Sequence, residues 1–301
     1  VISHATTEAQ EICEGTLENL ADRVEEAKLT SPALIIVGDV VALRRQLHFF
    51  EEKPLWGKHY LVAKIGPKPS RLAAMLRAKG AYTSECMTGE IVGVPAVYTA
   101  QELAHVDVLL FTSANGVDYF MKNVFASGLD ARALFHTRCA VIGQKTAEKL
   151  REYGICADFM PEHSNSTNLA QELKEYLDQE FRGDPFKRAV IWYPTAKNAK
   201  DNLVDTLLSF CDCGRLNVYE NVPCPMEVPV DKDVYDAIFF TCASSAERML
   251  GSLKPQERET LASVTDIYSI GPKCSAALGE LGVSPVIEAA VNTYEGLVNC
   301  V

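Results

Sequence analysis

Short apolar runs alternate with amphipathic stretches along most of this chain. Residues 107–120 open with the run Asp-Val-Leu-Leu-Phe, which is typical of a strand buried on both faces. The small polar residues Thr112, Ser113 and Asn115 follow where a helix would begin, and apolar residues return from Val117. This order predicts a strand, a tight polar turn and a helix.

The pattern occurs a second time, with Asp, Phe-Thr and Ala in register between two stretches of the chain. Two further pairs of turns repeat downstream of it. The matched pairs are 107–120 with 236–249, 140–147 with 268–275, and 164–169 with 292–297. An offset of roughly 128 residues is too long for a solenoid repeat, so it predicts the duplication of a whole domain.

Strands and helices are expected to alternate throughout, which favours parallel sheets covered by helices on both faces. The expected strands are 33–38, 60–65, 82–94, 107–111, 138–142, 156–160, 188–193, 215–222, 236–240, 266–270 and 285–287. The expected helices are 7–26, 40–50, 69–79, 99–105, 115–127, 144–153, 167–179, 201–211, 244–252, 273–281 and one from Tyr294. The fold class that follows is α/β, with two doubly wound parallel-sheet domains.

Composition narrows the class of protein. A chain of 301 residues with 48% hydrophobic and 23% charged residues is long enough for two modest globular domains. The net charge of -11 argues against nucleic acid or an anionic membrane as partner. No apolar run approaches the ~20 residues that span a bilayer, and no signal peptide opens the sequence. The sequence begins at Val1 without Met and in the middle of a pattern, so we expect a fragment.

The ten cysteines are scattered, several within apolar strands, so we expect buried free thiols in a reducing cytoplasm. The pair Cys211 and Cys213 lacks the spacing of a zinc site, and the six histidines form no metal-binding pattern. The glycine-rich signatures of nucleotide-binding loops and the nucleophile elbow are also missing. No metal, nucleotide cofactor or covalent nucleophile is therefore expected.

Polar residues gather at the ends of the expected strands, where helices begin. In a parallel sheet these turns share the carboxyl edge, and helix N-termini there favour anions such as carboxylates. The candidate ligand-binding residues are Thr112, Ser113, Asn115, Gln144, Lys145, Thr146, Ser164, Asn165, Ser166, Thr167, Lys197, Thr241, Ser244, Ser245, Pro272, Lys273 and Thr293. Each Ser, Thr or Asn could instead only cap its own helix. Seven such turns together favour a site for a polyanion.

Tyr219 is the other candidate. It lies in the extended run Leu-Asn-Val-Tyr-Glu-Asn-Val-Pro, which links one α/β stretch to the next. On the sequence alone, its side chain either projects toward a ligand or packs against its neighbours.

These motifs carry two resemblances. With the duplication, Phe-Thr-Ser, Ile-Gly-x-x-Thr and Val-Tyr-Glu-x-Val-Pro in this order, residues 57–301 resemble the uroporphyrinogen-III synthase family. The first fifty or so residues resemble the carboxyl-terminal end of uroporphyrinogen-III C-methyltransferase, through Ile-Ser-His-Ala-Thr-Thr, Gly-Thr-Leu and Ser-Pro-Ala-Leu-Ile-Ile-Val-Gly. Bifunctional fusions of these two enzymes are known in bacteria. The methyl-donor site of the methyltransferase family lies mostly in sequence missing here, so methyltransfer is not expected.

The synthase resemblance implies two domains joined by a two-stranded β-ladder, with strands at about 87–94 and 218–225. Residues 57–89 would pack with 224–301, residues 92–218 would form the other domain, and residues 1–53 would be the methyltransferase-like remnant and linker. The family's common residues differ from Lys64, Asp201, Lys273 and Cys274 here, which leaves individual contacts open.

The implied reaction is the cyclisation of hydroxymethylbilane to uroporphyrinogen III, with loss of water and inversion of ring D through a spiro intermediate. No cofactor is implied, and we expect a cytoplasmic monomer whose one possible protein partner is an upstream methyltransferase domain of the same chain. Tyr219 matches the tyrosine proposed as proton donor in the family, and phenols ordinarily keep their proton up to about pH 10. A two-domain anion-binding or sensory protein without turnover is the alternative, and a residual methyltransferase is a weaker one.

Overall fold

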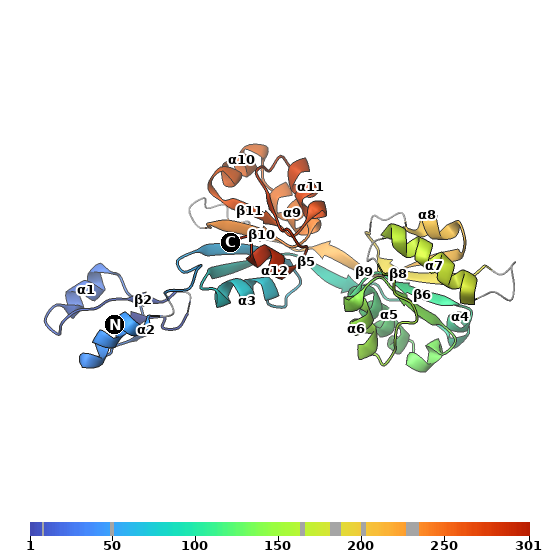
Figure 1. The fold of residues 1–301 in the computed structure, drawn as a ribbon, viewed down its shortest axis with the longest axis horizontal. Helices are drawn as coiled ribbons and strands as arrows, with labels where there is room; N and C mark the ends of the chain where they lie inside the picture. Colours follow the sequence, from blue (N-terminus) through green and yellow to red (C-terminus); the bar gives the residue numbers. More distant parts are fainter. Residues whose placement is uncertain (8, 49–50, 163–165, 181–187, 200–202, 227–234) are drawn as a thin grey trace. The chain divides into compact units, whose positions relative to one another are not determined.

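The computed structural model describes the chain from residue 1 to 301, except residues 8, 49–50, 163–165, 181–187, 200–202 and 227–234 (Figure 1). The chain divides into two compact units. Unit 1 comprises Val1–Glu90 and Pro223–Val301, and unit 2 is the continuous stretch Ile91–Val222.

Unit 2 is built on a parallel sheet with the strand order β7-β6-β8-β9. These strands are β6 (Val108–Phe111), β7 (Arg138–Val141), β8 (Val190–Ala196) and β9 (Asp212–Pro223). The four residues of β6 are all fully buried, with Leu109 and Phe111 in one hydrophobic cluster and Val108 and Leu110 in another. The prediction of a strand buried on both faces is confirmed.

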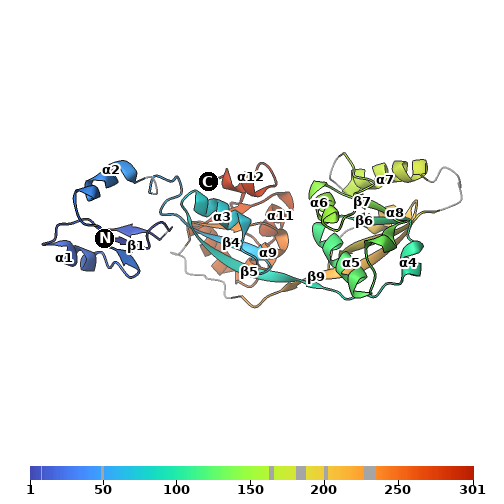
Figure 2. The same cartoon turned by 90° about the horizontal axis from the view of Figure 1, so that it is seen from below.

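Helices cover the two faces of this sheet (Figure 2). They are α4 (Ala100–Ala104), α5 (Ala114–Ala126), η2 (Ala131–Leu134), α6 (Gln144–Glu152), α7 (Ser166–Glu180) and α8 (Leu203–Leu208). Phe120 and Leu150, from α5 and α6, share one cluster, whereas Leu173 and Leu207, from α7 and α8, share the other. The amphipathic periodicity of the sequence thus places one apolar stripe of each helix on the sheet.

Unit 1 repeats this arrangement with the strand order β12-β11-β10-β4-β5. The strands are β4 (His59–Ile65), β5 (Tyr82–Gly93), β10 (Ala237–Phe240), β11 (Asp266–Ser269) and β12 (Ile287–Glu288), and β5 runs three residues past the unit boundary. The helices are α3 (Arg71–Ala78), α9 (Ala243–Gly251), α10 (Pro255–Val264), α11 (Pro272–Glu280) and α12 (Tyr294–Val298). Leu72 and Leu297 line one face of the sheet, and Met249 and Leu278 line the other. The predicted doubly wound α/β fold is therefore present.

The boundaries of the sequence repeats differ from the boundaries of the compact units. Strand order equates β8 with β4, β9 with β5, β6 with β10 and β7 with β11. One repeat runs from β4 to β7 and the next from β8 to β11, so each unit combines the beginning of one repeat with the end of the other.

A β-bulge lies at the same place in both units. The parallel pair β4–β5 shifts register between Lys64 and Ile65, and the pair β8–β9 shifts between Thr195 and Ala196. After the shift, Ile65 is opposite Gly89 and Ala196 is opposite Tyr219. Because bulges re-aim the side chains that follow them, the residue at this point of each strand is presented differently from one in a regular ladder.

The N-terminal segment, residues 1–52, differs from its sequence prediction. It forms a small antiparallel sheet, β2-β1-β3, with β1 (Ile2–Ser3), β2 (Glu11–Ile12) and β3 (Ala33–Leu34), and the helices α1 (Leu20–Glu26), η1 (Asp39–Leu43) and α2 (Arg44–Leu47). The expected buried strand 33–38 is wrong, because Ile35 and Val37 are 68% and 64% exposed. No second layer of the described chain packs over these residues, so their apolar composition does not lead to burial.

Three further expectations were inaccurate. α10 was not predicted, because its sequence Pro-Gln-Glu-Arg-Glu-Thr-Leu-Ala-Ser-Val buries little more than Leu261. The expected strand 156–160 contributes only an isolated bridge between Phe159 and Ala140. The expected long helix 7–26 is limited to α1.

Membrane-spanning helices were searched for in the described part of the chain, and none there is both long and apolar enough to cross a bilayer.

Candidate active site

The polar turn after β6 starts the candidate site in unit 2. Ser113 is the N-cap of α5, and its hydroxyl accepts a hydrogen bond of 3.0 Å from the backbone N–H of Gly116. A Cβ atom on Gly116 would lie 2.8 Å from the carbonyl oxygen of Pro194 in β8. Glycine therefore allows the first turn of α5 to lie directly on β8, which brings Ser113 toward the next strand, β9.

Tyr219 lies on β9 at the bulge, and its hydroxyl is 3.2 Å from the hydroxyl of Ser113. Its backbone carbonyl accepts a hydrogen bond of 2.7 Å from the N–H of Lys197, at the end of β8. The side chain is partly exposed at the edge of the unit 2 core. A phenol fixed at its backbone and hydrogen-bonded at its tip is suited to proton transfer.

Tyr119, which the sequence analysis did not single out, supports the ring of Tyr219. The two rings are stacked with their centroids 5.8 Å apart and their planes 26° from parallel. The hydroxyl of Tyr119 donates a hydrogen bond of 2.9 Å to the carbonyl of Ile91. The Lys122 ammonium lies 4.5 Å from the centre of the Tyr119 ring. The only signal for Tyr119 was its place on the predicted helix 115–127, six residues after Ser113.

An acidic group completes this surface of α5. Burial opposes ionisation of Asp118, but hydrogen bonds from Lys122 and Tyr153 hold the pKa of its carboxyl below the usual range. Burial and the bond to Asp118 together raise the pKa of Tyr153. Asp118 therefore remains a carboxylate that neutralises Lys122, and Lys122 is not an isolated cation beside the tyrosines.

Thr112 belongs to a second group of hydroxyls. Its Oγ1 is 3.2 Å from the hydroxyl of Tyr193, which also accepts a hydrogen bond of 3.4 Å from Thr195. Thr195 is 4% exposed, so this group lies inside the unit, with Thr112 partly exposed at its edge. Asn115, in the first turn of α5, is exposed.

The other predicted residues of unit 2 divide by exposure. Gln144 and Lys145, in the first turn of α6, are exposed, whereas Thr146 is buried. Lys197 is exposed and forms an ion pair of 3.0 Å with Glu220. Ser164 and Asn165 lie outside the described residues. For Ser166 and Thr167 the structure describes the backbone only, where α7 begins.

The predicted residues of unit 1 lie at the equivalent edge of its sheet. Thr241 and Ser244 are partly exposed, while Ser245 is fully buried, its hydroxyl 3.0 Å from that of Thr88. Pro272 and Lys273 are exposed in the first turn of α11. Thr293 caps α12 by accepting a hydrogen bond of 3.0 Å from the N–H of Gly296. Ser113 and Thr293 thus have the capping role that was the alternative to ligand binding.

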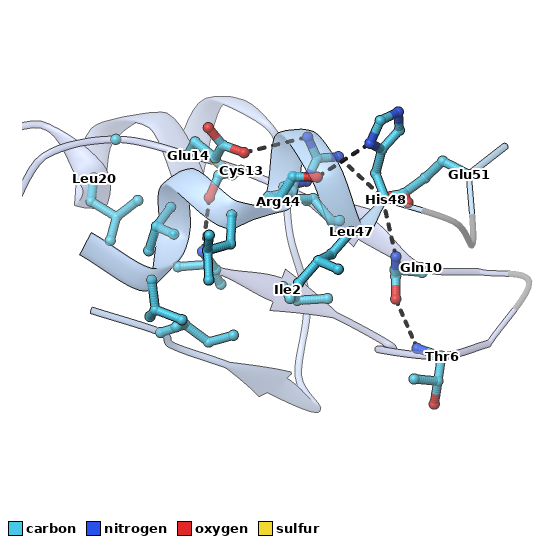
Figure 3. A pocket seen from close by; sticks show the side chains of 17 residues that line it. Ile2, Thr6, Gln10, Cys13, Glu14, Leu20, Arg44, Leu47, His48 and Glu51 are labelled. Carbon is cyan, nitrogen blue, oxygen red and sulfur yellow. Dashed lines mark hydrogen bonds and ion pairs between the residues drawn. The ribbon is translucent and has the colours of Figure 1, made fainter. Parts of the chain in front are cut away.

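A cavity of about 350 Å³ lies elsewhere, in the N-terminal segment (Figure 3). All of its lining residues fall between Val1 and Glu51, so none is a predicted site residue. Its polar side chains bind one another: Arg44 pairs with Glu14 and with Glu51, at 3.3 and 3.0 Å, and Gln10 donates to Glu51. The remaining lining is mainly aliphatic, so the cavity has no group suited to the chemistry of the polar turns.

Within the described ranges, no three His, Cys, Asp or Glu side chains are grouped closely enough to hold a metal ion. The donors that do converge are hydroxyl groups and helix N-termini in the two units.

Comparison with known proteins gives the family. The family model described as uroporphyrinogen-III synthase HemD matches residues 70–299. A porphyrin biosynthesis protein HemD from Ruminiclostridium josui is 27% identical over 309 residues, covering 99% of this chain and 59% of that protein. This chain therefore spans little more than half the length of that relative.

Two other similarities are to a methyltransferase and to a solved structure. A uroporphyrinogen-III C-methyltransferase from Bacillus subtilis is 33% identical over 136 residues, or 44% of this chain and 28% of that protein. A crystal structure of a mutant uroporphyrinogen III synthase from Thermus thermophilus matches with a TM-score of 0.55 and 20% identity, over 81% of this chain and 97% of that one. The two-domain fold is that of this structure, and the chain belongs to the uroporphyrinogen-III synthase HemD family.

Proposed function

We propose that this chain is a uroporphyrinogen-III synthase, which cyclises the linear tetrapyrrole hydroxymethylbilane to uroporphyrinogen III. The observation that carries the proposal is the family match over residues 70–299, together with a hydrogen-bonded tyrosine on the strand bulge of unit 2. Tetrapyrrole synthesis for haem, sirohaem or cobalamin is the corresponding pathway.

The substrate carries eight carboxylates, which the polar turns are suited to bind. Exposed or partly exposed residues start α5, α6, α9, α11 and α12, where free backbone N–H groups and the helix dipole favour anions. In this proposal Asn115, Lys145, Ser244 and Lys273 contact carboxylates directly. The buried Thr146 and Ser245 instead hold the turns in place.

Tyr219 is the proposed proton donor. The hydroxyl of the substrate leaves as water when it takes the phenolic proton, which leaves a positively charged, protonated azafulvene. The substituted carbon of ring D then attacks, and the spiro intermediate rearranges to invert that ring. The proton lost from carbon in the last step balances the one that Tyr219 gave, so the net change is the loss of one water. Holding the chain in the right conformation supplies the remaining acceleration.

The domain assignment is part of the proposal. Residues 57–89 with 224–301 form one synthase domain and residues 92–218 form the other, in line with the two compact units. Near the ends of the linking strands, Cys224 donates to the carbonyl of Thr88 within unit 1, and Val94 donates to that of Val218 within unit 2. These bonds support the ladder expected at 87–94 and 218–225.

The proposal also covers the origin of the N-terminal segment and the cellular compartment of the protein. We infer that residues 1–52 derive from the carboxyl-terminal end of a uroporphyrinogen-III C-methyltransferase, as their sequence resemblance implies. The chain's similarity to the Bacillus subtilis methyltransferase, over 136 residues, is in line with this. The cysteines form no disulfide within the described part of the chain, and burial raises the pKa of Cys139 to about 12. Thiols in this state favour a reducing cytoplasm. We propose a monomer that requires no cofactor.

The test is the substitution Tyr219→Phe, assayed with freshly prepared hydroxymethylbilane. Uroporphyrinogen III is separated from isomer I, which forms without enzyme. If Tyr219 supplies most of the proton transfer, the rate of isomer III formation should fall roughly 10²-fold, or about tenfold where water substitutes as donor.

Tyr82→Phe is the matched control, since Tyr82 lies on β5 and is 44% exposed. This variant should keep the wild-type rate and product ratio. A wild-type rate for Tyr219→Phe, with an unchanged melting temperature, would remove Tyr219 from the mechanism. Isomer I alone from the wild-type chain would reject the synthase function itself.

A further inference from the structure

We propose that Ser113 is a positioning residue that acts through Tyr219, rather than a residue that binds the substrate. It donates its hydroxyl hydrogen to the phenol oxygen, so that the hydrogen of Tyr219 is free for the departing hydroxyl. This inference rests on the proposed function, because it assigns a role in the same proton transfer.

The hydrogen bonds at Ser113 allow the direction that the proposal needs. Its oxygen accepts from the N–H of Gly116 at 3.0 Å and keeps one hydrogen to donate and one lone pair to accept. When the phenolic hydrogen is directed at the substrate, only Ser113 has a hydrogen left for this pair. The hydroxyl of Tyr219, at 3.2 Å, is within reach of that hydrogen. When Ser113 donates, Tyr219 becomes the acceptor in this pair and its own hydrogen points elsewhere.

The ring of Tyr219 is fixed independently of this bond. Tyr119 stacks on it, and Tyr119 is itself held by its bond to the carbonyl of Ile91. The bulge and the bond from Lys197 fix the backbone of Tyr219. Only the rotation of the phenolic O–H bond remains free, and a donor at Ser113 selects its direction.

The same bond assists once the proton has left. The phenolate of Tyr219 would then accept from Ser113, and a hydrogen bond to an ionised oxygen is about twice as strong as a neutral one. Ser113 also lies at the N-terminus of α5, a helix of 13 residues whose dipole favours negative charge there. Both effects are larger after the transfer than before it, as catalysis requires.

Unit 1 shows that the fold does not need this pair. At the matching positions it has Cys242 in place of Ser113 and Gly89 in place of Tyr219. Cys242 makes no side-chain cap to α9, yet α9 packs on its sheet as α5 does. The two hydroxyls of unit 2 therefore supply something other than the packing of helix on strand.

A double-mutant cycle tests the proposal. The wild type, Ser113→Ala, Tyr219→Phe and the double variant are compared in the assay that separates isomers III and I. Ser113→Ala should lower kcat roughly tenfold, the loss of one hydrogen bond worth about 1.4 kcal/mol, with KM little changed. In the Tyr219→Phe background, the same substitution should change kcat by less than about twofold.

Three variants separate positioning from folding. Ser113→Thr keeps both the cap and the hydroxyl, so it should recover most of the wild-type kcat. Ser113→Asp caps helices well but has no hydrogen to donate at pH 7, so kcat should fall although the melting temperature holds. Thr99→Ala removes the cap of α4 in the same unit and should leave kcat unchanged.

Two results would overturn the role of Ser113 and leave the synthase function standing. One is an equal loss of kcat from Ser113→Ala in the wild-type and Tyr219→Phe backgrounds, and the other is a rise in KM without a fall in kcat. Each would return Ser113 to substrate binding. A wild-type kcat for Tyr219→Phe itself would instead remove the proposed proton donor, and with it this role for Ser113.

Discussion

Unit 1 and unit 2 share four matched strands, a bulge at the same place and matched helix starts, but they have different side chains at matched positions. Where unit 2 has Tyr219 and Ser113, unit 1 has Gly89 and Cys242. Duplication has thus conserved the packing of apolar strand on amphipathic helix, while the residues at the strand ends have diverged. In a chain of this kind, the residues that differ between matched positions are better guides to chemistry than those that agree.

A second matched position differs in charge. Glu85 is opposite Val62 in unit 1, and Arg215 is opposite Tyr193 in unit 2, at the same distance from the two bulges. Glu85 accepts from the N–H of Ser70 at the start of α3, at 2.9 Å. Arg215 donates instead to the carbonyls of Ala196 and Ala199, at 2.7 and 3.0 Å. Each charged side chain stabilises the loop that follows the neighbouring strand. The carboxylate of Glu85 accepts from a backbone N–H of that loop, and the guanidinium of Arg215 donates to backbone carbonyls.

The largest expected effect is at Gly116, whose counterpart in unit 1 is Ser245. Gly116→Ala places a methyl group 2.8 Å from the carbonyl oxygen of Pro194, so α5 must move. The free energy of unfolding should fall by about 3 kcal/mol, the upper part of the range for overpacking. Synthase activity should fall as well, because Ser113 moves with the helix.

Ser245→Ala is the comparison variant, since that position already holds a side chain. It loses the buried hydrogen bond from Thr88, which contributes about 1 kcal/mol, and the weaker contact with the sulfur of Cys242 at 3.0 Å. Urea denaturation of both variants measures the difference. Equal losses would show that the close approach of helix and strand is not specific to unit 2.

The next effect concerns pH. Burial by itself would raise the pKa of Glu85, but hydrogen bonds from Lys64, Ser70 and Arg77 hold it below the usual range. A carboxyl whose pKa is lower when folded stabilises the protein above its unfolded value of about 4.3, and this contribution disappears as the pH falls further. Glu85→Gln should therefore cost about 2 kcal/mol at pH 7 and much less at pH 3.

Arg215→Gln provides the contrast, because a guanidinium stays charged throughout this range. Its loss of stability should be the same at pH 7 and at pH 4. Thermal unfolding of the wild type and both variants between pH 7 and pH 4 measures these losses of stability. For Glu85→Gln and the wild type the series is continued to pH 3. A Glu85→Gln penalty that stayed constant with pH would mean that Glu85 stabilises α3 without its charge.

The smallest effect is a gain. Cys242 has φ and ψ of -164° and 155°, close to the -151° and 151° of Ser113, but makes no side-chain cap. Cys242→Ser should supply the missing bond to the first turn of α9 and stabilise unit 1 by about 0.5 to 1 kcal/mol. A raised denaturation midpoint with unchanged synthase activity is the expected result, and a lowered one would show that the sulfur packs better than a hydroxyl.

The sequence was sufficient for most of the fold because the strands are short, apolar and bounded by polar turns. β6 and β10, for example, are predicted within one residue of where they occur. Periodicity was less informative where packing is incomplete. Residues 33–38 have the composition of a buried strand, but burial depends on a covering layer that a local pattern does not encode.

The sequence predicted which residues belong to the candidate site, but not which of their side chains touch one another. Strand ends and helix starts indicated Thr112 and Ser113, and the extended run with its family resemblance indicated Tyr219, but the sequence did not indicate that Ser113 meets Tyr219. That contact depends on the bulge in β9 and on the absence of a side chain at Gly116, two backbone features without a periodic signature. Tyr119 was missed for the same reason, since stacking across a helix and a strand is set by tertiary packing.

The exchange of half-repeats between the units also has a consequence for synthesis on the ribosome. Unit 2 is continuous, so it is able to fold as soon as residue 222 has emerged. β4, with Leu61, Val62 and Ala63 almost fully buried in the finished protein, is made first but must wait for its partner β10. During that interval a strand of high aggregation tendency has one unsatisfied edge, and this is the period in which a nascent chain of this kind depends most on chaperones.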